Sequence, residues 1–444
     1  MRSLGLFLVV AGMASSQTPT ASVVGRVVDA SGAVIPGVAV SVVQLATNQA
    51  FTKVTDAAGD FTVLYLTPGK YMMEGFRAQK QAEFVLTVNQ TLRFGIQMEV
   101  GATTESVTVT DTPTPLTTES GARGDVTTNQ ELTEMPLAGR NFSDLAYLTG
   151  GVLPKGEDGD GAYAINGARA DNVGFLLDGM NNTQRRNTGS MANPPLEGVQ
   201  EFKMITSGFS AEYGRYAGGI LSVVMKSGGN KLRGSLYEFL RNDVLDARGF
   251  FAVTKPKLRR NQFGATVSGP IMKNRTFFLF SWESLRQVSG SLQRGIVPQP
   301  EMLRGDFRNA RDPFGKPLVI TDPLNRAAPF GGNQIPAARL DPVALKLASF
   351  FPAPNLVCAG VNYIGQANGT SSSNNFSVKV DDTVSARDRL TFSTFWRPNE
   401  STTPFNRSPI ALFGTTTANF ELLSSIRYLR TVSSSLFNEP IFGS

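Results

Sequence analysis

The chain has 444 residues, with 42 Lys and Arg against 36 Asp and Glu, and it contains no His and a single Cys. The missing His excludes Ser-His-Asp and Cys-His nucleophile systems, His-ligated zinc hydrolases and imidazole proton shuttles, and one Cys cannot build a Cys-only metal site. The net charge of +6 is spread along the chain, and the longest basic stretch lies at 255–260, so we expect no nucleic-acid partner.

An export signal is predicted over residues 1–16. Arg2 supplies a positive charge, and the apolar run at 4–14 is too short to span a bilayer as a helix. Small residues then offer a cleavage point before Gln17. The mature chain is therefore expected outside the cytoplasm, where its single Cys can form no internal disulfide.

Residues 22–100 alternate short β-rich runs with turn residues at a spacing of about 8–12 positions, which is typical of a small antiparallel β-sandwich. Alternate residues of a strand share one face. The core is therefore expected to include Phe61, Leu64, Leu66 and Tyr71.

The turn motifs of this segment resemble those of the carboxypeptidase regulatory-like domain. They are Gly25-Arg26-Val27, Pro36-Gly37-Val38, Gly59-Asp60-Phe61 and the run at 66–71. That family is a β-sandwich of the carbohydrate-binding-like kind with no catalytic residues of its own. The resemblance therefore implies no peptidase activity.

A Thr-rich linker with two Pro residues is predicted over 101–121. Thr and Pro offer little apolar surface to offset the entropy of ordering, so residues 102–118 are expected to lack stable long-range contacts. The stretch at 105–111 alternates Val with polar residues. It could add as an edge strand to another protein's sheet, or it could be the last strand of the sandwich.

From 122 to 229 the pattern changes to mixed α and β. Asn129 opens a predicted helical turn, and Ser143 is the expected N-cap of another. An apolar strand at 173–179 ends in an Asp-Gly turn. The paired carboxylates at 158–160 lie in a Gly-rich loop, and we interpret them as a solvated turn rather than an acid–base pair. No catalytic, cofactor-binding or metal-binding residue is predicted.

Residues 230–444 contain segments of period 2 with one apolar and one polar face. Strands of about 8–10 residues with aromatic residues near their ends are typical of outer-membrane barrels, although soluble sandwiches show the same alternation. A short turn is expected at 381–389 and a long outward loop at 290–374. The apolar face is predicted to carry Phe263, Val267, Phe376, Val378, Phe392 and Trp396.

Five motifs in the middle segment resemble the plug of TonB-dependent outer-membrane transporters of the Oar-like group. They lie at 135–142, 177–179, 200–203, 210–214 and 226–228. Met135 and Ala138 stand where Leu and Asn are more usual in that group. The group has a regulatory-like domain, a plug and a barrel in this order.

The resemblance implies a mainly β fold in which an N-terminal β-sandwich, an α+β plug and a partial antiparallel transmembrane β-barrel follow one another. The expected boundaries are a signal peptide at 1–16, the sandwich at 22–100, the linker at 101–121, the plug at 122–229 and the partial barrel at 230–444. It also implies a non-enzymatic receptor or transporter of the cell outer membrane that uses no cofactor. A ligand would dock on plug and loops, and pulling by TonB would remodel the plug.

The implied partners are the TonB energy-transducing complex, outer-membrane lipid and a glycan, siderophore or peptide ligand. The residues expected to contact TonB are Glu105, Ser106, Val107, Thr108 and Val109.

Length conflicts with a closed barrel of family size. Such a barrel has 22 strands and, at about 10 residues per strand plus loops, exceeds about 400 residues. Only 215 residues follow Gly229, and we expect about 6–10 strands there, fewer than half of the set. A truncated or split chain with an open sheet and two unpaired edges is therefore expected. The alternative function is a secreted β-rich adhesin or carbohydrate-binding protein, and a hydrolase is disfavoured by the missing His.

Overall fold

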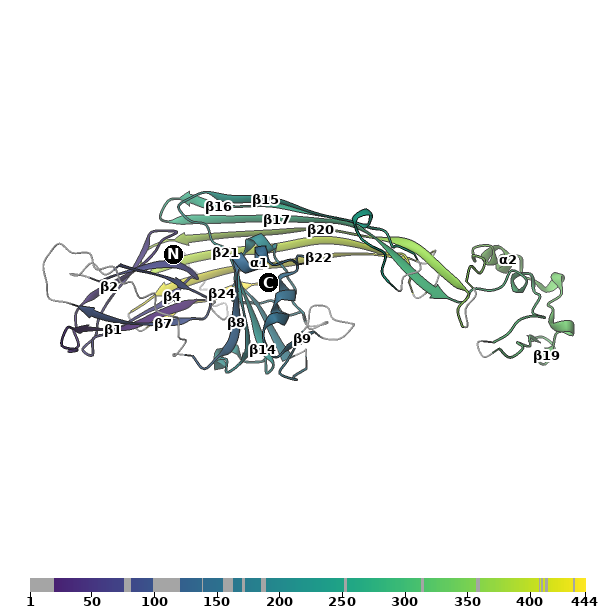
Figure 1. The fold of residues 1–444 in the computed structure, drawn as a ribbon, viewed down its shortest axis with the longest axis horizontal. Helices are drawn as coiled ribbons and strands as arrows, with labels where there is room; N and C mark the ends of the chain where they lie inside the picture. Colours follow the sequence, from purple (N-terminus) through teal and green to yellow (C-terminus); the bar gives the residue numbers. More distant parts are fainter. Residues whose placement is uncertain are drawn as a thin grey trace, which may run out of the picture.

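The polypeptide folds into three β-rich parts that follow one another along the chain (Figure 1). The computed structural model describes residues 20–75, 81–98, 120–137, 139–154, 163–169, 172–184, 189–250, 254–312, 315–356, 360–406, 408, 410–411, 414–433 and 436–444.

The N-terminal domain (residues 20–98) is a sandwich of two sheets, with strand orders β4-β1-β7 and β3-β2-β5-β6. Its strands are β1 (Ala21–Asp29), β2 (Ala39–Gln44), β3 (Gln49–Val54), β4 (Asp60–Leu66), β5 (Gly69–Gly75), β6 (Gln81–Leu86) and β7 (Thr91–Met98). The pairs are antiparallel except that β1 and β7 are parallel. These two strands are the first and the last of the domain, so no local turn signal could reveal their relative direction.

Phe61, Leu66 and Tyr71 lie in the core of this domain as expected, with 3%, 0% and 0% of their surface exposed. Leu64 does not, because Val63 is buried in its place and Leu64 is only half-buried. The register of β1 and β4 shifts at this point, and Tyr65 has a positive φ of 59°. This β-bulge interrupts the alternation of faces between Val63 and Leu66. A strict period of 2 counted back from Leu66 therefore assigns Leu64 to the wrong face.

The middle domain (residues 120–225) is built on a five-stranded sheet of order β12-β11-β14-β13-β8. Its strands are β8 (Arg123–Thr128), β9 (Val152–Pro154), β10 (Tyr163–Ile165), β11 (Val173–Leu177), β12 (Met180–Asn181), β13 (Val199–Ser207) and β14 (Gly219–Met225), and its helices are α1 (Asn129–Glu134) and the 3-10 helices η1 (Phe142–Leu148), η3 (Leu196–Gly198) and η4 (Ala211–Tyr213). All residues of β11 and β14 are buried, which agrees with their apolar sequences.

Two local predictions for the middle domain have different outcomes. Asp178 and Gly179 both have positive φ and join β11 to β12, as the Asp-Gly signal predicts. The cap of η1, however, is Asn141, whose side chain accepts a hydrogen bond from the backbone N–H of Ser143. Ser143 itself is the second residue of that helix, so its prediction as the N-cap is wrong. Asn and Ser cap helices about equally well, so composition did not separate them.

The third part is an eight-stranded sheet, here called the wall, of order β15-β16-β17-β20-β21-β22-β23 with β24 also pairing β22. Its strands are β15 (Arg233–Asn242), β16 (Leu258–Met272), β17 (Thr276–Gly295), β20 (Tyr363–Thr383), β21 (Asp388–Thr403), β22 (Thr415–Thr431), β23 (Phe437–Asn438) and β24 (Ile441–Gly443), and η5 (Asp243–Leu245) follows β15. Every pair in it is antiparallel.

The long loop and the short turn of the wall both span fewer residues than expected. The loop spans 296–362 rather than 290–374, because β17 and β20 pair continuously up to Gly295 and Tyr363. Backbone hydrogen bonds extend the hairpin through Ser, Gly and Asn residues that carry no apolar alternation. The turn joining β20 to β21 spans 384–387. The loop holds β18 (Thr321–Asp322), β19 (Ala328–Pro329), η6 (Met302–Arg304), η7 (Gly331–Asn333), η8 (Ala337–Arg339) and α2 (Pro342–Ala348).

The two faces of the wall differ as the period of 2 predicts. On β16, Gln262 and Thr266 are buried against the middle domain, while Phe263 and Val267 lie on the opposite face. Ladder partners share a face, so the outward face also carries the other predicted residues: Phe376, Val378, Phe392 and Trp396. The wall is therefore an open antiparallel sheet with an apolar outer face, as in part of a transmembrane barrel.

The N-terminal and middle domains both lie along the wall (Figure 1). The middle domain packs under the inner face of the wall, the N-terminal domain lies at the end where short turns join the strands, and the 296–362 loop projects from the opposite end. We call these the short-turn end and the loop end. Within the described residues, no helix combines the length and the apolarity that crossing a membrane requires.

Candidate functional site

The residues that couple the three parts form the candidate functional site. They lie between the middle domain and the inner face of the wall, and between the N-terminal domain and both of them. Their common feature is charge in places that are closed to water. Such charges are stable only when they are paired, so each pair indicates where one part is held against another.

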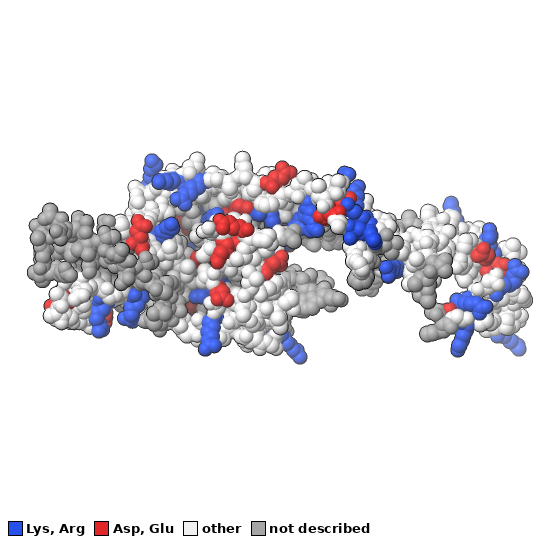
Figure 2. Space-filling model, viewed as in Figure 1, with Lys and Arg blue, Asp and Glu red and all other residues white. Residues whose placement is uncertain are grey.

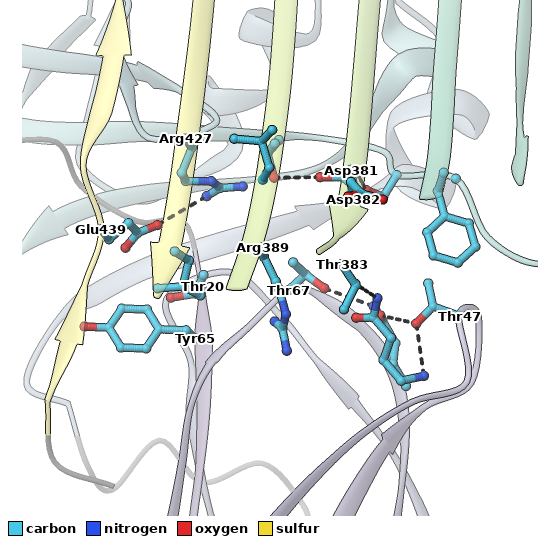
Figure 3. Close-up of a pocket in the computed structure, with 18 residues that line it drawn as sticks. Thr20, Thr47, Tyr65, Thr67, Asp381, Asp382, Thr383, Arg389, Arg427 and Glu439 are labelled. Carbon is cyan, nitrogen blue, oxygen red and sulfur yellow. Dashed lines mark hydrogen bonds and ion pairs between the residues drawn. The ribbon is translucent and has the colours of Figure 1, made fainter. Parts of the chain in front are cut away.

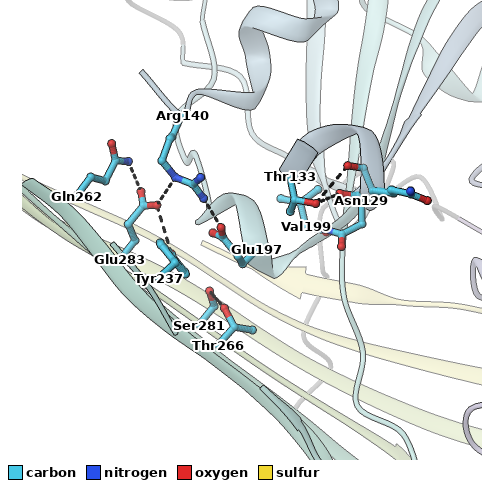
Figure 4. Close-up of polar contacts among 11 residues, drawn as sticks. Asn129, Thr133, Arg140, Glu197, Val199, Tyr237, Gln262, Thr266, Ser281 and Glu283 are labelled. Carbon is cyan, nitrogen blue, oxygen red and sulfur yellow. Dashed lines mark hydrogen bonds and ion pairs between the residues drawn. The ribbon is translucent and has the colours of Figure 1, made fainter. Parts of the chain in front are cut away.

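Arg140 is the centre of the first contact (Figure 4). It pairs with Glu197 of the middle domain, and its Nε atom lies 3.5 Å from Oε2 of Glu283 on β17 of the wall. The three side chains are exposed by only 7–11%. Two carboxylates thus share one guanidinium, and the wall contributes one of them.

Wall side chains hold Arg140 and Glu283 in position. The Gln262 amide donates to Glu283 over 2.8 Å, and the Tyr237 hydroxyl over 3.3 Å. The Arg140 guanidinium lies 4.0 Å from the ring centre of Phe239 and 4.9 Å from that of Tyr237, both on β15. A planar guanidinium can donate hydrogen bonds to carboxylates from its edge and stack on aromatic rings with its face. The ammonium of Lys cannot do both.

Gly264 makes room for this arrangement. A Cβ atom added there would lie 2.5 Å from the Tyr237 hydroxyl oxygen, because the tyrosine lies across the backbone of the neighbouring strand. The added Cβ would lie closer still to the Trp282 carbonyl oxygen, so a side chain at Gly264 would strain the ladder to β17 as well as displace the ring under Arg140. Close approach also occurs at Gly198, where a Cβ would lie 3.1 Å from the side chain of Ser281 on the wall.

The second contact joins Asp178 of the middle domain to Lys379 of β20. The Nζ atom lies 3.2 Å from Oδ2, and the two side chains are exposed by 4% and 6%. Asp178 also accepts the backbone N–H of Met225 over 3.0 Å, and Lys379 donates to the Met225 carbonyl over 3.3 Å. The pair therefore ties the turn after β11 and the end of β14 to the wall.

Three inward apolar residues of the wall belong to the core of the middle domain. They are Leu279, Phe395 and Leu423, and they pack in one cluster with side chains such as Phe175 and Phe202. The period of 2 predicts a polar inner face for the wall. These three positions are instead apolar because they face the core of the middle domain rather than water.

The N-terminal domain contacts the middle domain through the loop at 87–90. Glu201 accepts the backbone N–H of Val88, and Lys203 donates to the Asn89 carbonyl over 3.2 Å. Burial raises the pKa of Glu201 to about 7 and lowers the pKa of Lys203. Burial disfavours the charged form of each group, and for Glu201 it outweighs the Val88 hydrogen bond and the neighbouring ammonium.

The N-terminal domain also meets the short-turn end of the wall (Figure 3). Gln49 donates to Thr383, and the Arg389 guanidinium lies 4.2 Å from the ring centre of Phe51. The rings of Tyr65 and Phe437 are 4.8 Å apart. A cavity of about 70 Å³ remains in this contact, and one of about 550 Å³ lies where the three parts meet, with Lys70, Glu201 and Lys379 in its lining.

The predicted TonB-contacting residues Glu105 to Val109 lie outside the described residues, as do residues 1–16 and the linker core at 102–118. No sequence pattern indicated that Glu197, Glu283 or Lys379 is functional. Arg140 and Asp178 lie within the motifs at 135–142 and 177–179, which carry the resemblance but no predicted role for either residue. Their only sequence signal is a charge within an otherwise apolar or small-residue context. In the part of the chain that the structure describes, no cluster of His, Cys, Asp and Glu is placed to hold a metal ion.

Three families match successive parts of the chain. The carboxypeptidase regulatory-like domain matches residues 22–99, the TonB-dependent receptor plug domain matches 101–220, and the outer membrane beta barrel domain matches 224–444. The TonB-dependent transporter Oar of Myxococcus xanthus is 28% identical over 249 residues, which are 51% of this chain and 23% of Oar. The chain thus spans about a quarter of the length of the curated relative that it matches.

Solved structures of two outer-membrane proteins are similar over 72% of this chain. They are the outer membrane transporter YddB from Escherichia coli, with a TM-score of 0.45, 11% identity and 38% of its chain covered, and a ferric enterobactin receptor mutant from Pseudomonas aeruginosa in complex with enterobactin, with a TM-score of 0.43, 13% identity and 40% covered.

Proposed function

We propose that this chain, which belongs to the TonB-dependent receptors of the bacterial outer membrane, takes up a ligand by releasing its middle domain from the wall. The family is one of transporters rather than enzymes. The middle domain is then the plug, and the wall is part of the transmembrane barrel. The observation that carries this proposal is the buried charge at their contact, at Arg140 with Glu283 and at Asp178 with Lys379.

Buried ion pairs suit a contact that must hold and then open. Their net contribution to stability is small, because the cost of dehydrating both ions offsets their attraction. When force separates the partners, water can solvate each ion, so opening the charged part of the contact costs less than opening an apolar contact of equal area. Release must also withdraw Leu279, Phe395 and Leu423 of the wall from the core of the middle domain, and this part supplies the main resistance to force. The pairs also fix one orientation of the plug, because a displaced partner leaves an unpaired buried charge.

The energy for release would come from the TonB complex of the inner membrane. We propose that TonB contacts Glu105, Ser106, Val107, Thr108 and Val109, where Val alternates with polar residues and could pair with a strand edge. The domain boundaries of the sequence analysis, including the linker at 101–121, form part of this proposal. The ligand is of glycan, siderophore or peptide type, and outer-membrane lipid surrounds the barrel.

The N-terminal domain lies across the route that release would open. Its Val88 N–H donates a hydrogen bond to Glu201 of the plug, and its Gln49 side chain donates one to Thr383 at the short-turn end of the wall. Short turns of a transmembrane barrel face the periplasm. A ligand leaving the plug on that side meets this domain, so uptake requires it to move as well.

Deletion of 105–109 tests the proposal. The deletion should abolish binding of the purified periplasmic domain of TonB and energised uptake of any ligand identified from a panel of siderophores, oligosaccharides and peptides. Binding of that ligand to the cell surface should be retained. A matched deletion of 113–117 in the same linker serves as the control. If the 105–109 deletion binds TonB as well as the intact chain does, the assigned contact is wrong.

A further inference from the structure

The outer face of the wall changes character along its strands. A row of aromatic side chains crosses three neighbouring strands at Trp282, Phe376 and Trp396, which are ladder partners. The rings of Phe376 and Trp396 stack at 4.8 Å, and Phe263 meets Trp282 edge-on at 5.7 Å. Such a row marks the rim of the apolar band of a transmembrane barrel, where hydrocarbon ends and headgroups begin.

Two arginines stand on the same face just beyond this row, toward the loop end. Arg286 is four residues after Trp282 on β17, and Arg259 is four residues before Phe263 on β16, so each shares the outward face of its aromatic residue. Four residues of strand cover about 13 Å, or about 10 Å of height at the usual barrel tilt. Both guanidinium groups therefore lie at headgroup level. Figure 2 shows a group of Lys and Arg side chains near the end of β15, in the middle part of the molecule, with Asp and Glu side chains among them.

The two arginines are diagonal neighbours across the β16–β17 ladder, because Arg286 pairs with Asn261 and Arg259 pairs with Val288. Diagonal positions are about 7–8 Å apart, which is within the reach of two long side chains toward one group between them.

Neither arginine has a carboxylate partner among the described residues. Arg286 donates to the carbonyls of Leu285 and Ser373 over 2.8 and 2.9 Å and to the Asn374 side chain over 3.1 Å, so its guanidinium is held in place with its charge uncompensated. Arg259 is exposed, and no ion pair involves it in the described part of the chain. Two like charges this close together, of which Arg286 is held in place, favour an anion between them.

Asp243 lies close to Arg259, because its carboxylate accepts the backbone N–H of Leu258 over 3.0 Å, but no ion pair joins Asp243 to Arg259 in the described part of the chain. The acidic residues on the outward strand face stand further away. Glu238 pairs with Phe263, about 13 Å along the strand from the level of Arg259. Glu400 is at the level of Arg286 but lies two strands away, at about 10 Å.

We propose that Arg259 and Arg286 together bind the phosphate group of a phosphorylated lipid in the outer leaflet of the membrane, with the acyl chains of that lipid against the aromatic row. Guanidinium groups bind phosphate oxygens in a bidentate manner, and the stems of both arginines can lie along the apolar band. The proposal rests on the proposed membrane placement, which puts the loop end outside. It adds a lipid site that the transport function does not require.

The test uses the intact chain in detergent micelles and three probes: bisphosphorylated lipid A, the same lipid A after enzymatic dephosphorylation, and inorganic phosphate. Native mass spectrometry gives the bound fraction of each. Bisphosphorylated lipid A should bind at least about tenfold more tightly than the dephosphorylated lipid, and the double variant Arg259→Gln/Arg286→Gln should lose this preference. Arg294→Gln is the matched control, since Arg294 is exposed on the same face of β17 but eight residues beyond Arg286.

Equal binding of the two lipids to the unaltered chain would overturn the site, as would a loss of equal size in Arg294→Gln. Inorganic phosphate binding as tightly as bisphosphorylated lipid A would overturn the lipid as its ligand. Failure of the membrane placement has a different readout, because the unaltered chain and the double variant would then both fail to partition into vesicles. A chain that inserts but shows no lipid preference contradicts only this site.

Discussion

The Nζ atom of Lys379 on the wall lies 3.2 Å from Oδ2 of Asp178 in the plug, and both side chains are almost fully buried. A cation from one part of the chain is thus neutralised by an anion that lies about 200 residues earlier in the sequence. The pair lies on the inner face of the wall, where the proposed mechanism requires the plug to be held until it is released. Each partner is therefore a sensitive position for testing how the plug is seated.

Lys379→Met should loosen the plug by about 3–5 kcal/mol, because Asp178 would remain buried without its counter-ion. Limited proteolysis across a urea series would detect this as cleavage of the plug at lower urea. In Lys379→Met/Asp178→Asn the amide still accepts the Met225 N–H and carries no charge, so most of the loss should be recovered. An unchanged urea midpoint in the single variant would contradict the role of the pair.

Arg140→Lys should weaken the contact of plug and wall by about 2 kcal/mol although the charge is kept, because an ammonium cannot serve Glu197 and Glu283 together while stacking on Phe239. Hydrogen exchange of the backbone around Glu197 would rise. Arg169→Lys, at an exposed position of the same domain, should change nothing. If Arg140→Lys and Arg169→Lys raised hydrogen exchange equally, the weakening would not come from the contacts of Arg140.

The contact of the N-terminal domain with the plug should weaken as pH rises. The pKa of Glu201 is raised to about 7 by burial in the contact. A raised pKa means that stability is fully present below the ordinary carboxyl pKa of about 4.5 and is lost as pH passes through about 7. The Val88 amide, corrected for intrinsic exchange, should therefore exchange faster at about pH 8 than at about pH 5.

Glu201→Gln should flatten this pH dependence, because the amide oxygen still accepts the Val88 N–H but does not titrate. Glu134→Gln, at an exposed carboxylate of α1, is the control and should leave the dependence intact. A pH dependence that persists in Glu201→Gln would point to another group, of which Lys203 is the neighbour with a shifted pKa.

A cross-link between the N-terminal domain and the wall should block uptake and spare surface binding of the ligand. Gln49→Cys and Thr383→Cys, in a Cys358→Ser background, place two thiols across the contact for a short bismaleimide. Ser41→Cys/Thr52→Cys, on paired strands within the domain, is the control. Normal uptake by the cross-linked protein would show that the domain does not need to move.

Phe395→Ala should destabilise the plug by about 3–5 kcal/mol, although the residue belongs to the wall, because its side chain fills the plug core and is 2% exposed. Phe392→Ala on the outward face of the same strand is the matched control, and it should not affect the plug. Thermal unfolding of the plug, monitored as its susceptibility to protease, should distinguish Phe395→Ala from Phe392→Ala.

The domain order was predictable from the sequence because it depends on local signals. Turn residues, the period of 2 and short motifs each act within about ten residues of chain. They identified the sandwich residues Phe61, Leu66 and Tyr71, the turn at Asp178 and the outward face of the wall. The predictions for Leu64 and Ser143 were wrong. A β-bulge shifts the burial pattern around Leu64 by one residue, and a competing cap residue lies two residues before Ser143; no local pattern resolves either difference.

The contacts between the parts were decided only by the tertiary structure. A lone Lys on the polar face of a strand, such as Lys379, has the same local sequence whether it meets water or a buried carboxylate. Its partner is chosen by how the wall curves over the plug, and that depends on many backbone pairings far apart in the chain. The sequence by itself determined which strands form and which faces are apolar, since these follow from alternation and turn chemistry. Only the packed molecule decided that Arg140 meets Glu283, and that Glu201 meets Val88, because burial turns an ordinary surface charge into one that must find a partner.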